Sequence, residues 1–258
     1  MFNSRFFRIS IFHFRALNAL FSIQTAILLA IISPLFEFTF FILMAKFFTG
    51  TNDLTFWCIG NSIVIIKTTT LFSIAGYFMT ERFNGTLKYL FFSPVNKFTF
   101  LVSISVIPMI LAFIQVSCGL VVGIVFFKMQ INLSIMPLYF LNLLIVIFSS
   151  LMFGITISSL GMVLPQMHVA LNIAYSFIMI FSGANYPLSV IPPVLRWISY
   201  ILPMSRGIQS ARNILADQFS PRLMIEELIV GICYLLIGVF MLKITQHLAK
   251  KLGTLELY

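Results

Sequence analysis

The sequence predicts an all-α, polytopic membrane protein with six transmembrane helices. Of its 258 residues, 60% are hydrophobic and only 9% are charged, whereas a soluble domain carries about 25% charged residues. Long apolar stretches recur along the chain, and most exceed the roughly 20 residues that a helix needs to cross about 30 Å of hydrocarbon. Short segments with Lys and Arg separate these stretches, as is typical of loops between membrane spans.

The whole chain, residues 1–258, is predicted to form a single transmembrane domain. The six spans are expected at 21–47, 54–79, 99–127, 133–160, 166–182 and 225–246. The fifth of them is barely long enough to cross. Lys and Arg gather in the leader, in the 80–98 loop and at the C-terminal end, so six spans place all three on one side, and both termini are expected in the cytoplasm. Four arginines within 196–222 oppose this orientation, because the same topology places them outside.

The leader, 3–18, is predicted to be an amphipathic helix in the cytoplasmic interface of the membrane. Arg5, Arg8 and Arg15 lie among Phe and Ile residues, and such arginines are attracted to anionic lipid headgroups. The alternative is a flexible basic leader that only sets orientation. No small-residue cleavage site follows, so no signal peptide is expected to be removed. These topology signals account for much of the net charge of +9, and no nucleic-acid partner is expected.

Residues 183–203 are still apolar but are interrupted by residues that break helices, among them Gly183, Pro187, Pro192 and Pro203. A continuous span there would leave backbone groups without hydrogen bonds in lipid. We therefore expect a re-entrant hairpin of two short helices between spans five and six, dipping into the outer leaflet while it packs against protein.

The sequence contains none of the common motifs that would give it chemistry of its own. It has no GxxxxGK[ST] phosphate loop, no HExxH and no GxSxG, so no ATP site, metal site or nucleophile is predicted in this chain. An intramembrane enzyme would need an acidic or His cluster near one interface. The acidic pair Glu226 and Glu227 is interpreted instead as the solvated start of span six.

Two charged residues lie inside predicted spans, where charge is costly and usually has a role. Glu37 in span one and Lys67 in span two lie about 15 and 20 Å from the short 48–53 turn, at 1.5 Å per residue. We expect them to pair or to line a polar path, and a purely structural ion pair is the alternative. Gly119 and Gly123 form a GxxxG in span three, which is interpreted as ordinary close packing.

The 80–98 loop is predicted to contain a short amphipathic helix at 81–94. An acidic and a basic residue extend span two into water, a Gly-Thr pair permits a sharp turn and caps a new helix, leucines form its apolar face, and a proline ends it. These residues are Glu81, Arg82, Gly85, Thr86, Leu87, Leu90 and Pro94. From spacing alone, such a helix either lies on the membrane or docks into a partner protein.

Two segments resemble motifs of the ABC-2 type transporter permeases. The first is ERFNGTL at 81–87, followed by Ser93 and Pro94; the second is SGANYPL at 182–188, followed by Ile191-Pro192, Leu202-Pro203 and Arg212. They occur in the order and with the intervening spans of that family, so the resemblance covers essentially the whole chain. The resemblance implies the ABC-2, or type V exporter, fold and a membrane-spanning transport subunit without catalytic residues.

The resemblance also implies partners and a role for each segment. Two permeases would form a dimer, more readily a homodimer than a heterodimer, and would bind two copies of a cytoplasmic ATP-binding subunit that holds the ATP and Mg²⁺. This chain would need no cofactor. The 81–94 segment would be the coupling helix, with 3–18 beside it, and 183–203 would supply the re-entrant helices near the outer mouth. This chain departs from the family pattern in one respect: the acidic character of the loop rests on Glu81 alone, with Arg82 beside it.

The function expected from this resemblance is ATP-driven export across the cytoplasmic membrane of a bacterium. The form of the 81–94 loop is most similar to members that export drugs, peptide antibiotics or lipid-linked oligosaccharides, and few intramembrane charges suit an amphiphilic cargo. A polysaccharide or teichoic-acid exporter of the same family is the alternative. A secondary transporter coupled to an ion gradient is a further alternative, for which Glu37 is the only expected buried acid.

Overall fold

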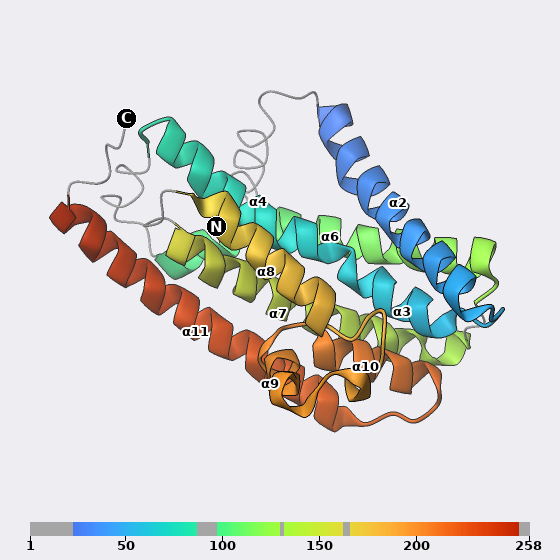
Figure 1. Cartoon of the computed structure of the whole chain (residues 1–258). Coiled ribbons are helices and arrows are strands. Elements are labelled where there is room, and N and C mark those ends of the chain that lie inside the picture. The colour runs from blue at the N-terminus through green and yellow to red at the C-terminus, as the bar shows by residue number, and fades with distance from the viewer. Residues whose placement is uncertain (1–22, 87–96, 130–131, 162–165, 253–258) are drawn as a thin grey trace.

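A computed structural model describes residues 23–86, 97–129, 132–161 and 166–252, and every regular element in these ranges is a helix. The long helices run roughly along one direction, and a group of short helices closes one end (Figure 1). Within these ranges, five helical segments are long and apolar enough to cross a membrane. They are Ile31–Thr49, Thr55–Phe83, Phe100–Phe127, Met136–Ser159 and Pro221–Thr245.

The remaining predicted span is a shorter helix. Where 166–182 was expected to cross, the structure has α8, Met167–Phe181, of 15 residues. At 1.5 Å per residue α8 is about 22 Å long, which is less than the roughly 30 Å of the hydrocarbon layer. Six crossings therefore stay a prediction. The predicted leader helix at 3–18, with Arg5, Arg8 and Arg15, lies outside the described residues.

The long helices owe their length to uninterrupted apolar sequence. They are α2 (Ile23–Thr49), α3 (Thr55–Val64), α4 (Ile66–Phe83), α6 (Lys97–Phe127), α7 (Met136–Gly161) and α11 (Pro221–Leu252). Helices α3 and α4 are one span that is broken at Ile65. Pro34 and Pro108 lie inside α2 and α6, a position that spans tolerate because neighbouring helices and side chains satisfy the freed backbone groups.

Helix α7 and the α3–α4 span form the centre of the bundle. Helices α4 and α11 both pack along α7, and α6 packs on α3 and α4. The α3–α4 span is the most deeply buried of the five candidates, whereas α2 and α11 are mostly exposed. The exposed residues of α2 include Phe36, Phe40 and Phe47. A bundle with a buried centre and an apolar outer surface is the arrangement expected in lipid.

The segment between α8 and α11 lies at one end of the bundle, opposite the end where α4 finishes and α6 begins (Figure 1). It holds the 3₁₀ turn η2 (Leu188–Val190), α9 (Pro193–Ile201) and α10 (Ser205–Leu215). Gly183 turns the chain with φ +76° after α8, Pro187 and Pro192 precede η2 and α9, and Pro203 separates α9 from α10. Only one α-helix thus falls within 183–203, and the second begins beyond it.

Gly154 lets α7 approach α4 more closely than any other amino acid at this position would allow. A Cβ at this position would lie 2.2 Å from the carbonyl oxygen of Thr70, and a backbone atom cannot move away as a flexible side chain can. The GxxxG of α6 packs less tightly, on α3. A Cβ at Gly119 would lie 3.2 Å from Ile65, and one at Gly123 would lie 3.6 Å from Cys58.

The contact between α7 and α4 at Gly154 can be tested by substitution. Gly154→Ala should lower the free energy of unfolding by about 3 kcal/mol, the upper range for overpacking, because α4 and α7 must separate to admit the methyl group. Gly123→Ala is the matched control, since its new methyl group makes only an ordinary contact. Equilibrium unfolding in mixed micelles measures both variants. Equal stability of the two would show that α4 and α7 are not this close.

Candidate functional site

Helix α4 ends in a hydrogen-bonded turn built from the residues that stood out in the 80–98 loop. The N–H of Thr86 donates to the carbonyl of Glu81 at 2.9 Å, and the N–H of Gly85 donates to the carbonyl of Arg82 at 3.1 Å. Gly85 has φ +67°. These two bonds around a left-handed residue form a Schellman motif, which ends a helix and sets the direction in which the chain leaves it.

The side chains of Glu81 and Thr86 reinforce the same turn. The Thr86 hydroxyl lies 3.1 Å from the Glu81 carbonyl and also donates to the Glu81 carboxylate. Phe83, in the last turn of α4, has 93% of its surface exposed. The sharp turn expected at Gly85 and Thr86 is therefore present, and Glu81 is part of it.

The predicted helix beyond this turn cannot be followed. Leu87, Leu90 and Pro94 lie outside the described residues, so the role of 81–94 stays a prediction.

A polar cluster joins α2, α4 and α8 inside the bundle. The Nζ of Lys67 lies 2.6 Å from Oε1 of Glu37, and the Tyr175 hydroxyl donates to the same oxygen at 3.0 Å. Lys67 also lies over the Tyr175 ring, 4.6 Å from its centroid. The Lys67 side chain is fully buried, whereas that of Glu37 is 23% exposed. The second carboxylate oxygen of Glu37, Oε2, accepts no hydrogen bond from the described residues.

Polar residues also occupy an exposed face of α8 near this cluster. His168, Asn172 and Ser176 follow each other at four-residue spacing and are all exposed, so they lie on one face of the helix. Thr68, next to Lys67, is exposed on α4. Polar groups at membrane depth usually face protein or a water-filled space rather than lipid.

At the α9–α10 end, Arg212 fastens the chain after α8 to the start of α3. Its guanidinium donates to the carbonyls of Gly183 and Ala184, both at 2.8 Å, and to that of Phe56 at 3.1 Å. It also lies 3.4 Å from the centroid of the Phe56 ring. Burial lowers the pKa of Arg212 to about 9, so the guanidinium still carries its charge at pH 7. Such a charge-assisted set of bonds fixes the two segments together.

A second set of bonds joins the same two segments. The indole N–H of Trp57 donates to the carbonyl of Asn185 at 2.9 Å, and the amide of Asn61 donates to the Asn185 side chain at 2.9 Å. The first two turns of α3 therefore move with the 183–185 segment.

Glu227 is a fully buried carboxylate that holds the start of α10. Its Oε1 accepts the N–H of Met204 at 2.8 Å and the hydroxyl of Ser149, and its Oε2 accepts the N–H of Gly207 at 3.3 Å. The interpretation of Glu226 and Glu227 as a solvated helix start is thus wrong for Glu227. Glu227 lies on the side of α11 that packs against α7 and the start of α10, and Glu226, about 100° further round the helix, lies at the edge of that contact.

The other member of the pair has a surface role. Glu226 has 35% of its side chain exposed and lies 3.2 Å from Arg206 and 2.8 Å from Arg222.

The profile of the ABC-2 type transporter family matches residues 5–216 of the chain. The chain belongs to this family. The resemblance seen in the two sequence motifs is therefore confirmed. A comparison with curated proteins found no match. As the membrane subunit of an ABC-2 type transporter, the protein is a multi-pass transport subunit that lacks the ATPase and works with an ATP-binding partner subunit. Nucleotide binds to that partner, and an ABC-2 permease needs no cofactor of its own. Within the described ranges, no three His, Cys, Asp or Glu residues come together as a metal site would require.

Two residues of this permease were missed by sequence reasoning. Tyr175 lies in an apolar stretch, where a single tyrosine gives no signal. Glu227 did give a signal, since an acid followed by a long apolar stretch on a single helix is costly unless it is bonded.

Proposed function

We propose that two copies of this permease form the path by which an amphiphilic cargo is exported across the cytoplasmic membrane of a bacterium, driven by two copies of the ATP-binding partner. The cargo class is a drug, a peptide antibiotic or a lipid-linked molecule. The observation that carries this proposal is the α3–α4 span. One of its ends is the Glu81–Thr86 turn and the other is bonded to the 183–185 segment.

The 81–94 segment is the contact with the ATP-binding partner in this proposal. The Schellman turn gives the chain a defined exit from α4, so a load applied beyond Thr86 reaches the helix axis rather than being absorbed by a loose linker. The exposed Phe83 offers an apolar side chain to the same contact. Glu81 is engaged inside the turn, so its role is to shape the turn as well as to supply charge.

Movement of α4 would reach the opposite end of the molecule through α3. The break at Ile65 divides the span, and the bonds of Trp57, Asn61 and Arg212 make the 183–185 segment follow α3. A partner that binds two conformations of α4 with different affinity would thus shift the α9–α10 end between two states. This is the mechanical link that the proposed transport cycle requires.

The polar residues on α4 and α8 support a path along this side of the bundle. The Glu37 side chain is partly exposed, and His168, Asn172 and Ser176 form a polar face on α8. Within a membrane-spanning dimer, such a face suits the polar part of an amphiphile while the surrounding apolar residues suit its hydrocarbon part. A polysaccharide or teichoic-acid cargo is the second candidate, favoured by the same polar face.

The partners of the two buried acids, Glu37 and Glu227, argue against coupling to an ion gradient. Glu37 is already paired with Lys67, and Glu227 accepts three hydrogen bonds. Neither acid is left free to bind and release a coupling ion.

The orientation proposed is cytoplasmic for both termini and for the 80–98 loop. The four arginines that oppose it are all engaged within the protein. Arg196 donates to the carbonyls of Ser189 and Ile191, Arg212 is bonded to carbonyls, and Arg206 and Arg222 share Glu226. Arg196 and Arg212 are thus bonded to carbonyls of the protein itself rather than left to the anionic headgroups of the cytoplasmic leaflet.

The experiment that tests the proposal changes Gly85. Gly85→Ala places a Cβ in the left-handed region, which costs about 1–2 kcal/mol, although the new methyl group meets no atom of the described residues within 4 Å. We expect ATP-driven uptake of an amphiphilic dye into inverted vesicles that hold the permease and its partner to fall by up to roughly thirtyfold. ATP hydrolysis by the partner should persist, since the partner itself is unchanged.

Gly85→Asn is the matched control, because Asn tolerates a positive φ. It should retain most of the transport. Equal loss in both variants, or full transport in Gly85→Ala, would contradict the coupling role of this turn. Transport in vesicles that lack the partner would overturn the proposal as a whole.

A further inference from the structure

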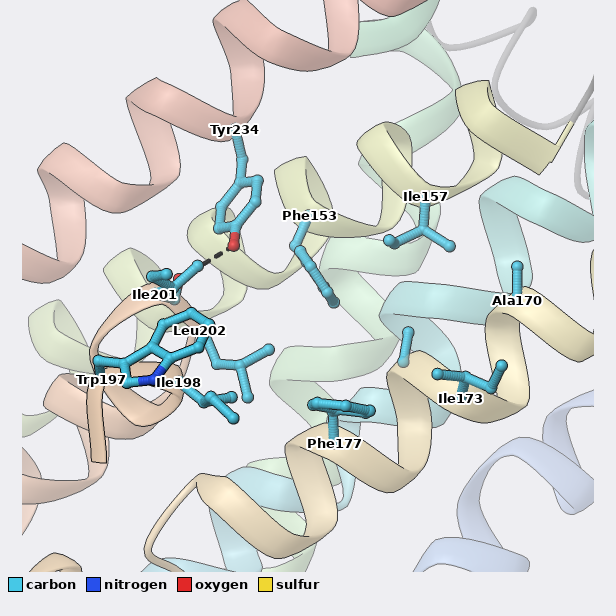
Figure 2. Close-up of a pocket in the computed structure, with 11 residues that line it drawn as sticks. Phe153, Ile157, Ala170, Ile173, Phe177, Trp197, Ile198, Ile201, Leu202 and Tyr234 are labelled. Atoms are coloured by element: carbon cyan, nitrogen blue, oxygen red, sulfur yellow. Dashed lines mark hydrogen bonds between the residues drawn. The ribbon is translucent and has the colours of Figure 1, made fainter. Parts of the chain in front are cut away.

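An apolar groove opens on the side of the bundle between α7, α8, α9 and α11 (Figure 2). It has a volume of about 310 Å³. Phe153 forms its floor on α7, Phe177 and Ala170 line it from α8, Trp197 from α9 and Tyr234 from α11. It is separate from the Glu37–Lys67 cluster.

Water is a poor occupant for this groove. Filling it would take about ten water molecules at roughly 30 Å³ each, and each would need two to four polar partners. The polar side-chain groups of the lining are the Tyr234 hydroxyl and the Trp197 indole, and the hydroxyl already donates to the carbonyl of Ile201 at 3.0 Å. An apolar occupant that excludes water is therefore strongly favoured.

The open side of the groove has the apolar rim expected of a surface that faces the hydrocarbon layer. Two of its walls, α7 and α11, are candidate membrane spans, and its rim residues Ile173, Phe177 and Trp197 are 53%, 41% and 57% exposed. We propose that this groove binds one acyl chain of a membrane phospholipid. The chain lies over Phe153 and fills the space between α8 and α11, which are not among the helix pairs that pack closely on each other.

The position of α9 indicates where the headgroup lies. Trp197 and Tyr200 are exposed on α9, and aromatic residues of this kind gather at the membrane–water interface. The guanidinium of Arg206 lies 5.6 Å from the Tyr200 ring and is paired with Glu226, so a charged pair stands beside these aromatic residues, as expected at the polar boundary of the membrane. The bound phospholipid thus belongs to the leaflet at the α9–α10 end.

A photoreactive lipid tests this site. The full-length protein is placed in vesicles of phosphatidylcholine that contain a small share of phosphatidylcholine with a diazirine at the middle of one acyl chain. After illumination, lipid adducts are mapped by mass spectrometry of peptides. In the wild type we expect an adduct at Tyr234, which is half-buried in the groove. Ala170→Phe fills the groove and should remove this adduct.

Two controls separate bound lipid from surrounding lipid. Ile229 is 52% exposed on α11 and is not among the groove residues, so its adduct should be the same in every variant. Val169→Phe adds the same ring one residue away, on the exposed surface of α8, and should leave the Tyr234 adduct in place. Ile173→Trp fills the groove from its rim and should act as Ala170→Phe does.

Lipid bound in the groove is distinguished from surrounding lipid without any transport measurement. Loss of the Tyr234 adduct in both groove-filling variants, with Ile229 unchanged, supports the acyl-chain site. An unlabelled Tyr234 in the wild type, or labelling that persists when the groove is filled, overturns it.

Discussion

Replacing Glu227 by alanine is expected to lower the free energy of unfolding by about 3 kcal/mol or more. The change strands the buried N–H groups of Met204 and Gly207, and each unsatisfied buried donor costs roughly 1–3 kcal/mol. Ser149 loses less, because its hydroxyl can donate instead to the carbonyl of Val146, which lies 3.0 Å away. Met204 has φ +76°, an uncommon conformation for a residue with a side chain, and Glu227 is the group that holds its N–H there.

Glu226→Ala is the matched control, one residue away on the same helix. Glu226 is partly exposed, and its ion pairs with Arg206 and Arg222 are of the kind that contribute about 0–1 kcal/mol. Glu227→Gln should fall between the two, because an amide oxygen can still accept one N–H. Equilibrium unfolding in mixed micelles gives the ranking. If the two alanine variants lost equal stability, the carboxylate of Glu227 would not be the anchor of α10.

The long spans could be predicted from the sequence because their signal is redundant. The stretches expected at 99–127 and 133–160 are α6, Lys97–Phe127, and α7, Met136–Gly161. A run of more than 20 apolar residues has no other stable environment than lipid or a protein core. The approach of Glu37 to Lys67 followed for a related reason. A short turn between two antiparallel helices fixes their register, so depths that differ by only about one helical turn bring the two charges together.

The short helices could not be predicted as well. The prolines of 183–203 indicated where helix must stop, but α10 begins at Ser205, beyond the expected hairpin. The helical spacing of Ile208, Ala211 and Ile214, which are buried, was the signal for this helix. What holds its first turn is Glu227, from a distant part of the chain. Tyr175 could not be predicted for the same reason. Its role depends on the position of α8 against α2, which is a tertiary contact.

A large loss of stability is also expected when the charged pair of the polar cluster, Glu37 and Lys67, is broken. Glu37→Leu should cost about 3–5 kcal/mol, because it leaves the fully buried ammonium of Lys67 without its partner. Lys67→Met should cost less, since the Glu37 side chain is 23% exposed and keeps the hydroxyl of Tyr175 as a donor. The double variant should be close to the wild type in stability, because two apolar side chains replace the pair without stranding a charge.

Unfolding in mixed micelles measures the four proteins, and ATP-driven dye transport with the partner subunit is measured on the same set. A stable double variant that no longer transports would mean that the charges serve the path. A stable double variant with wild-type transport would mean that they only hold α2 against α4. If Lys67→Met proved the more harmful single change, Glu37 would have to be the buried partner, opposite to the observed exposure. The asymmetry follows from burial alone, so it tests the packing of α2 independently of what is transported.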